Sequence, residues 1–225
     1  MQNCAAFFKC YGPAIRPTPT PRVLDIGAQD VNGSLKRVVP KGFDYVGVDF
    51  VQGKGVDVVL DDPYNLPFDS DSADVVLSSS CFEHSELFWL LFLDILRVLK
   101  PGGLFYLNVP SNGDFHRWPV DCWRFYPDSG RALVTWAKRN GIDASLLESY
   151  TSSQNRDQWN DFVAVYVKDS GRAAQYPDRI LKHFTEFKNG LILGDDQILN
   201  FSVLPEDRRK LGVIWQILSG QVKVS

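Results

Sequence analysis

The chain has 225 residues, of which 44% are hydrophobic and 23% charged, and its formal net charge is −3 at pH 7. This length and composition suit one globular α/β domain with an additional segment. The slightly acidic balance and the lack of a long apolar window argue against nucleic acid or a membrane as partner.

The cysteines and histidines show no metal-binding spacing. The relevant residues are Cys4, Cys10, Cys81, Cys122, His84, His116 and His183. No Cys-x-x-Cys pair occurs, so we expect no structural zinc site, no disulfide framework and no bound metal. The first 11 residues lack the apolar core of a signal peptide, which favours a cytoplasmic location.

The N-terminal half predicts several short strands. Residues 1–12 are expected to form a short helix, followed by an extended proline-rich lead-in. Strands are predicted at 23–26, 45–49, 56–60 and 73–79, with a short helix at 33–39. Only six residues, 50–55, separate the second and third strands, too few for a crossover helix. We expect a bare loop there; the alternative is that the two strands are not parallel neighbours.

The C-terminal half continues the alternation. The longest helix is predicted at 86–99, ended by Lys100-Pro101-Gly102-Gly103, with a strand at 104–109. A helix at 128–139 and strands at 146–151 and 162–167 follow, and the tail is expected to hold helices at 179–187 and 206–218. This order predicts a doubly wound, mainly parallel α/β sheet with helices on both faces.

Four ordered motifs stand out in the predicted domain. They are Asn65-Leu66-Pro67-Phe68, Ala73-Asp74-Val75-Val76, Phe82-Glu83-His84 and Leu96-Arg97-Val98-Leu99-Lys100-Pro101-Gly102-Gly103. In this order the chain resembles class I S-adenosylmethionine-dependent methyltransferases, close to the type-11 group, over roughly residues 20–168. The resemblance implies a Rossmann-like, seven-stranded sheet and S-adenosylmethionine as cofactor. It divides the chain into a lead-in (1–20), a methyltransferase domain (21–169) and a C-terminal extension (170–225).

The ends of the first three strands supply the predicted cofactor site. Asp25 precedes a turn that offers backbone N–H groups, and its carboxylate suits the ammonium of the methionine half. The family usually has a glycine-richer turn; here Gln29 and Val31 occupy two of those positions. The full predicted set is Asp25, Gly27, Ala28, Gly33, Asp49, Phe50, Asp61, Asp62, Ser79 and Ser80.

Individual roles follow from position and chemistry. Asp49 ends the second strand, where a carboxylate accepts both ribose hydroxyls in dinucleotide folds, and Phe50 is placed against the adenine. The resemblance implies an acidic residue after the third strand for the adenine amino group. Asp61 is favoured over Asp62 for that carboxylate, because Pro63 after Asp62 has no N–H to donate. The N–H of Asp62 then serves a ring nitrogen.

The loop after the fifth strand, residues 108–127, is the predicted acceptor side. His116 is the candidate general base with Asp121 as its orienting partner, and His84 is a second candidate. The candidate substrate-binding residues are Arg117, Trp118, Trp123 and Arg124. The alternative is structural: Arg124 pairs with Asp121 or Asp114, and the aromatic residues form the core of a lid.

The leading functional hypothesis is O-methylation of a small polar acceptor, saccharide-like or phosphorylated. The His-x-x-Pro-x-Asp-x-Trp-Arg-Phe pattern of the loop resembles methyltransferases of saccharide assembly. A non-catalytic cofactor-binding scaffold is the alternative, and a nucleic-acid methyltransferase is a weaker one, since no Asn/Asp-Pro-Pro-Tyr/Phe motif follows the fourth strand. The apolar tail segments 191–193 and 213–218 need burial, as a lid or as a homodimer contact.

Overall fold

The computed structural model describes residues 1–15, 20–153, 159–203 and 206–222. Its helices are α1 (Gln2–Tyr11), α2 (Phe88–Val98), α3 (Ser129–Arg139) and α4 (Glu206–Leu218). Its strands are β1 (Arg22–Ile26), β2 (Asp44–Asp49), β3 (Val58–Val59), β4 (Ala73–Ser79), β5 (Leu99–Pro110), β6 (Ala144–Ser152), β7 (Asp161–Lys168) and β8 (Phe187–Ile192). Strand β4 and helix α4 have the predicted bounds, and strand β3 is shorter than predicted.

All eight strands form one sheet in the order β3-β2-β1-β4-β5-β7-β6-β8. The first five in this order are parallel, and β7, β6 and β8 add antiparallel pairs. The strand order turns back at β1 and β4, and such a reversal is where open α/β sheets bind ligands. The sheet is therefore mainly parallel, as predicted.

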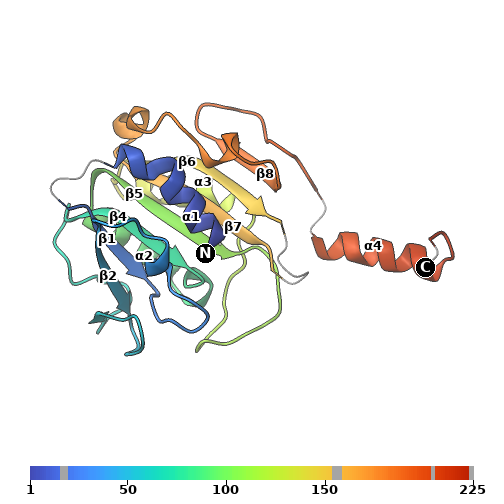
Figure 1. Cartoon of the computed structure of the whole chain (residues 1–225), viewed down its shortest axis with the longest axis horizontal. Coiled ribbons are helices and arrows are strands. Elements are labelled where there is room, and N and C mark those ends of the chain that lie inside the picture. The colour runs from blue at the N-terminus through green and yellow to red at the C-terminus, as the bar shows by residue number, and fades with distance from the viewer. Residues whose placement is uncertain (16–19, 154–158, 204–205, 223–225) are drawn as a thin grey trace.

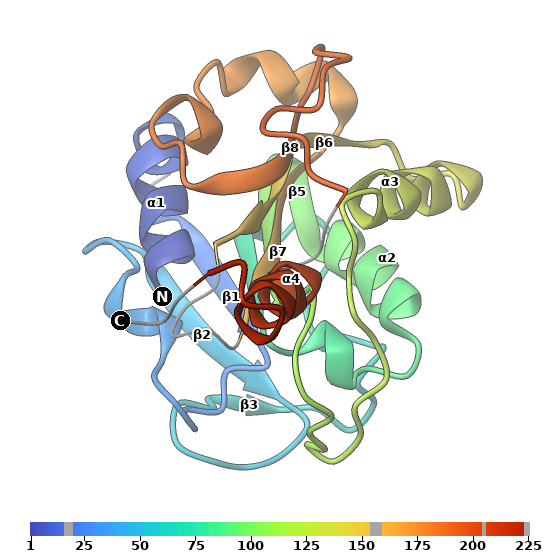
Figure 2. The ribbon, with the colours of Figure 1, turned by 90° about the vertical axis from the view of Figure 1, so that its right-hand side faces the viewer.

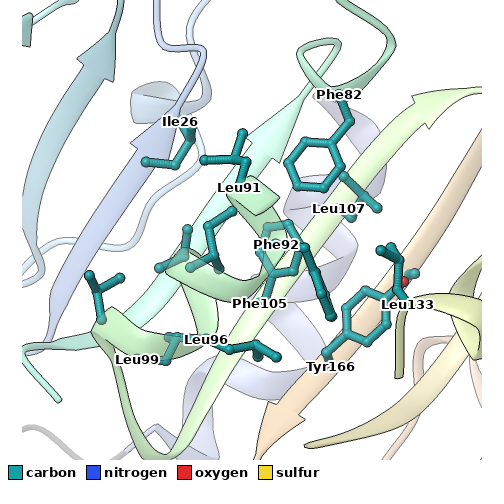
Figure 3. Packing of buried hydrophobic residues seen from close by; sticks show 14 of the residues in the cluster. Ile26, Phe82, Leu91, Phe92, Leu96, Leu99, Phe105, Leu107, Leu133 and Tyr166 are labelled. Atoms are coloured by element: carbon teal, nitrogen blue, oxygen red, sulfur yellow. The ribbon is translucent and has the colours of Figure 1, made fainter. Parts of the chain in front are cut away.

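Helices cover both faces of the sheet (Figures 1 and 2). Helices α2 and α3 lie on one face, where Leu91, Phe92 and Leu133 join the larger core cluster; Figure 3 shows its packing. Helix α1 lies on the other face with Phe7, Phe8 and the side chains of the C-terminal extension. Because both faces are covered, the central strands are apolar along most of their length, which explains their continuous hydrophobic sequence.

The connection between β2 and β3 is a bare loop, which confirms the prediction of parallel neighbours without a crossover helix. The loop is tight: a Cβ added at Gly47 would lie 2.0 Å from the carbonyl oxygen of Gly55. The predicted helix at 33–39 is wrong in extent, because only Leu35–Arg37 form a short 3-10 turn. Val39 is followed by Pro40, which disfavours helical backbone in the residue before it.

The C-terminal extension adds an eighth strand where seven were predicted. The predicted helix at 179–187 is wrong: only Ile180–Lys182 form a 3-10 turn, and Phe187 begins β8. Tertiary contacts override the helical pattern, since the buried carboxylate of Glu148 accepts hydrogen bonds from the backbone N–H of Ile180 (2.7 Å) and of Leu181 (3.0 Å). Leu191 is buried in β8, so this segment completes the sheet and is not a lid.

Helix α4 stands away from the body of the protein (Figure 1). Its apolar side chains are exposed, including Leu211, Ile214, Trp215 and Leu218. No helix in the described part of the chain is both long and apolar enough to span a membrane.

Candidate functional site

The carboxyl ends of β1, β2 and β3 lie next to one another, because these strands are parallel neighbours. Asp25 lies near the end of β1, Asp49 ends β2, and Asp61 follows β3 by two residues. Asp25 and Asp49 are buried, at 2% and 8% exposure, whereas Asp61 is exposed. The three predicted cofactor carboxylates thus come from adjacent strands at one edge of the sheet.

Asp25 is held by a residue that the sequence analysis did not select. The Tyr45 hydroxyl donates to Asp25 Oδ2 at 2.6 Å. Burial raises the pKa of Asp25 to about 7 and the charge of Asp49 adds to this, while the Tyr45 hydrogen bond lowers it. Strand register explains the contact: Tyr45 pairs with Val23, whose side chain shares a face with that of Asp25.

Stability of the unliganded chain is expected to fall as the pH rises from 5 to 7. The folded state raises the pKa of Asp25 above its ordinary value near 4, so it binds a proton that the unfolded chain releases in this range. Each pH unit there costs up to about 1.4 kcal/mol. Thermal unfolding of Asp25→Asn, which is neutral throughout, should show a shallower slope; an identical slope would contradict the assignment. Glu83, whose pKa burial raises to about 8, and Glu148 and Asp161, whose pKa values burial also raises, contribute to the slope that remains.

The turn after β1 differs from the expectation of free backbone N–H groups. Those of Gly27 and Ala28 both donate to the carbonyl of Val48, at 2.9 and 3.1 Å, and that of Gly33 donates to Asp30. Gly27 has φ +84°, and a Cβ there would lie 2.6 Å from the Cβ of Cys81. The turn therefore lets a ligand approach its backbone closely, but the N–H groups of Gly27, Ala28 and Gly33 already donate to other residues.

Asp49 organises the neighbouring loops. Its Oδ2 accepts from the backbone N–H of Gln29 at 3.1 Å and its Oδ1 accepts from that of Val51 at 3.2 Å. Each carboxylate oxygen keeps a second lone pair, so two hydroxyl donors can still be accepted. Phe50 is 44% exposed at the same edge.

The two aspartates after β3 are distinguished by their contacts. Asp62 Oδ1 accepts from the backbone N–H of Tyr64 at 2.9 Å, so this carboxylate serves its own turn. Beyond β4, Ser79 is half-buried and Ser80 is exposed, with φ +52° and its N–H donating to the Asn108 carbonyl. The choice of Asp61 for the carboxylate role stays a prediction.

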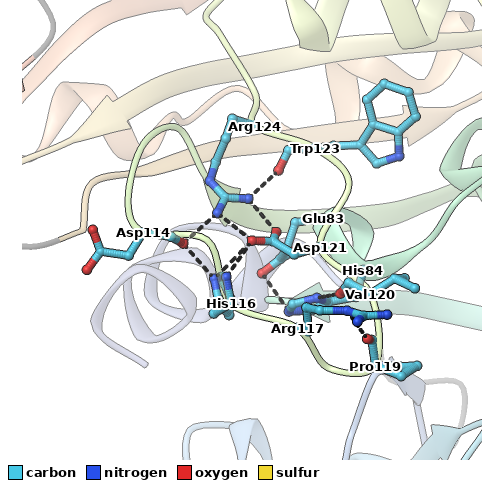
Figure 4. A network of polar contacts seen from close by, with 10 residues as sticks. All are labelled: Glu83, His84, Asp114, His116, Arg117, Pro119, Val120, Asp121, Trp123 and Arg124. Atoms are coloured by element: carbon cyan, nitrogen blue, oxygen red, sulfur yellow. Dashed lines mark hydrogen bonds and ion pairs between the residues drawn. The ribbon is translucent and has the colours of Figure 1, made fainter.

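The acceptor loop is built around the Asp121 carboxylate (Figure 4). Arg124 donates to both of its oxygens, at 2.6 and 2.8 Å, and the backbone N–H of His116 donates at 2.7 Å. The Arg124 guanidinium is the main reason that the pKa of Asp121 falls to about 2. Arg124 also donates to the carbonyls of Trp123 and Asp114, so the structural alternative describes this residue correctly.

The two candidate bases lie together although 32 residues separate them. The rings of His84 and His116 have centroids 4.9 Å apart at 90°. The side chain of His84 is 10% exposed and burial lowers its pKa, whereas that of His116 is 41% exposed. Glu83, which the sequence analysis did not select as a site residue, places its carboxylate 3.7 Å from His84 Nε2.

The aromatic residues of the loop divide into two groups. Trp123 packs against Phe88 and Trp89 of α2 and donates to the Ser85 carbonyl, so it holds the loop against that helix. Trp118 is 57% exposed, and Arg117 donates to the carbonyl of Pro119 at 3.1 Å.

Trp159, from the segment before β7, adds a further aromatic face. Its ring lies 5.0 Å from the His116 ring, and a Cβ at Gly113 would overlap it. The sequence analysis did not select Trp159; only its place just before the last predicted strand pointed to this edge.

Comparison with known proteins places this geometry in a family. A methyltransferase domain family matches residues 24–107. The phthiotriol/phenolphthiotriol dimycocerosates methyltransferase of Mycobacterium tuberculosis is 35% identical over 149 residues, covering 64% of this chain and 48% of that protein. The chain thus spans about half the length of this relative.

Solved structures share the fold. A putative sarcosine dimethylglycine methyltransferase from Galdieria sulphuraria aligns with a TM-score of 0.54 at 15% identity, over 75% of this chain and 84% of that one. The 1,6-didemethyltoxoflavin-N1-methyltransferase of Burkholderia thailandensis aligns with a TM-score of 0.52 at 16% identity, over 75% and 88%. Residues 24–107 of the chain therefore match a methyltransferase domain, and the chain shares the fold of these two methyltransferases.

Proposed function

We propose that this chain transfers a methyl group from S-adenosylmethionine to a hydroxyl of an acceptor held by the loop of residues 110–127. The observation that carries the proposal is the meeting of two groups at one sheet edge: carboxylates from β1, β2 and β3, and the His84–His116 pair just beyond β4. Cys81 connects them, because it packs against Gly27 and lies two residues before Glu83.

The cofactor roles follow from burial and charge. Asp25, with its pKa near 7, ionises readily when the ammonium of the methionine half approaches. Asp49 accepts the ribose hydroxyls on its remaining lone pairs, and Asp61 accepts the adenine amino group. The close approach of Cys81 to Gly27 supports a sulfonium position between the turn after β1 and the residues that follow β4.

Methyl transfer from a sulfonium needs an aligned acceptor more than covalent help. His116 is the better candidate to take the hydroxyl proton, because its ring is partly exposed while that of His84 is enclosed. A positioned base contributes roughly 10²–10⁴-fold to such a step.

The charged and aromatic side chains of the acceptor loop bear on the acceptor class. Arg124 is engaged by Asp121, which removes one cation from the set expected to bind a phosphorylated acceptor. The loop presents Phe115, Trp118 and Tyr126 at 76%, 57% and 65% exposure, and aromatic faces bind sugar rings and apolar groups alike. A saccharide-like hydroxyl is our first candidate; a lipid hydroxyl is the second, favoured by the dimycocerosate relatives.

The test is calorimetry with S-adenosylhomocysteine, followed by turnover with labelled S-adenosylmethionine on saccharide and lipid hydroxyl acceptors. We expect one binding site per chain and labelled product from one acceptor class. Binding without turnover on any acceptor would favour the scaffold alternative, and no binding at high micromolar ligand would contradict the proposal. Burial of the exposed apolar side chains of α4 against a second copy of the chain stays a prediction.

A further inference from the structure

The strongest unexplained feature of the protein is the buried carboxylate of Glu83. Its side chain is 1% exposed, and its Oε2 has no hydrogen-bond partner among the described residues. A buried polar atom without a partner is costly, and a buried carboxylate normally pairs with a cation or binds a metal. The Glu83 backbone carbonyl, by contrast, is satisfied by the N–H groups of Cys122 and Trp123.

Two imidazoles lie beside this carboxylate. One side-chain ligand atom from each of Glu83, His84 and His116 lies within 4.8 Å of the others. Glu83 Oε1 and His84 Nε2 are 3.7 Å apart. Two ligands on one tetrahedral metal, each bonded at about 2.1 Å, lie about 3.4 Å apart, so this pair needs only a small contraction, and His116 must move closer from within the 4.8 Å limit.

The hydrogen bonds of both histidines leave a nitrogen free. His84 Nδ1 contacts the Val120 carbonyl, and His116 Nδ1 lies 3.0 Å from the Asp114 carbonyl and 3.4 Å from Asp121 Oδ2. Since a carbonyl only accepts, Nδ1 carries the proton in each neutral ring and Nε2 keeps its lone pair. Metal-bound histidines are commonly held this way, with the second nitrogen donating to a carbonyl or carboxylate.

We propose that Glu83, His84 and His116 bind one divalent transition metal of the zinc class. Two imidazoles and one carboxylate suit Zn²⁺, whereas Mg²⁺ and Ca²⁺ prefer sites made of oxygen ligands alone. The proposal departs from our expectation of no metal, which rested on sequence spacing alone.

Three protein ligands leave a position open for an acceptor oxygen, as in catalytic zinc sites. The partial exposure of His116 gives that position access to solvent, and Trp159 packs on the ring of the same histidine. A metal there would lower the pKa of a bound hydroxyl, so that neither histidine need act as the base. This catalytic role rests on the proposed methyl transfer; metal binding itself does not.

The test is titration of the chelator-treated full chain with Co²⁺ and Zn²⁺, followed by visible absorption and calorimetry. We expect one Co²⁺ per chain, with the visible bands of a four- or five-coordinate centre, displaced by Zn²⁺. Glu83→Gln and His116→Ala should each weaken binding at least tenfold. His116 is partly exposed, so its variant is expected to fold even where Glu83→Gln does not, and unchanged S-adenosylhomocysteine binding checks this.

His183→Ala is the matched control. It removes the remaining histidine of the chain, which pairs with Asp178 and lies in a separate group with Cys10, and it should bind Co²⁺ as the wild type does. Loss of binding in His183→Ala, unchanged binding in His116→Ala, or no binding at all would overturn the proposal. Metal binding without S-adenosylhomocysteine binding would support the metal site and contradict the proposed function. S-adenosylhomocysteine binding without metal binding would overturn the metal site and leave the proposed function in place.

Discussion

Asp49→Ala is expected to weaken S-adenosylhomocysteine binding by roughly 10²–10⁴-fold. A hydrogen bond to a charged acceptor contributes about 1.5–3 kcal/mol, and two ribose hydroxyls are expected on this carboxylate. Calorimetry on wild type and variant measures the difference directly. Wild-type affinity in the variant would remove Asp49 from the cofactor site.

The control must account for the structural contacts of Asp49, since the variant also loses hydrogen bonds from the backbone N–H groups of Gln29 and Val51. Asp57→Ala provides it. Asp57 Oδ2 accepts from the Gly47 backbone N–H at 2.8 Å, in the same loop region, and Asp57 has no predicted cofactor contact. We expect Asp57→Ala to lower the melting temperature while leaving ligand affinity within about twofold of wild type, well below the effect of one charged hydrogen bond.

Asp121→Ala is expected to loosen the acceptor loop and reduce methyl transfer more than cofactor binding. The change leaves Arg124 without its bidentate partner and the His116 N–H without an acceptor. Loss of such charged hydrogen bonds costs about 1.5–3 kcal/mol, which corresponds to roughly 10–100-fold faster hydrogen exchange in residues 111–127.

Asp114→Asn is the companion variant for this loop. Asp114 contributes only its backbone carbonyl to the contacts drawn in Figure 4, and that group is kept in the variant. The rate of hydrogen exchange in residues 111–127 of Asp114→Asn should therefore match that of the wild type. Equal exchange in Asp121→Ala and Asp114→Asn would show that the ion pair does not hold the loop.

Acid should act on the wild-type loop as the Asp121 variant does. Folding lowers the pKa of Asp121 to about 2, so its stabilising contribution is complete above pH 4 and is lost as the pH falls from about 4 to 2.

Much of the fold could be predicted because its signals are local. An unbroken apolar run bounded by turns marks β4, and the predicted end of the long helix at residue 99 lies one residue beyond α2, although Gly102 and Gly103 lie within β5 and do not end the helix. Both features act through neighbouring residues, which is what pattern and turn chemistry report. Strand β8 escaped prediction because Glu148, far from it in sequence, holds the segment that precedes it.

The same distinction between local signals and long-range contacts applies to the residues of the candidate site. Asp25, Asp49 and Asp61 could be selected in advance, because each stands at the end of a recognisable strand. Tyr45 and Glu83 could not: one depends on strand register, and the other on a loop that folds back from beyond β5.

The amino-acid sequence by itself determined the resemblance to methyltransferases, the order of the strands along the chain up to β7 and the carboxylates at the strand ends, since these follow from short-range pattern and spacing. Only the tertiary structure decided that Arg124 pairs with Asp121, that the C-terminal extension completes the sheet, and that Glu83, His84 and His116 meet. The last two contacts join segments more than 30 residues apart, and the first depends on which of two nearby carboxylates, Asp121 or Asp114, the folded loop brings to the guanidinium. Local sequence carries neither kind of information.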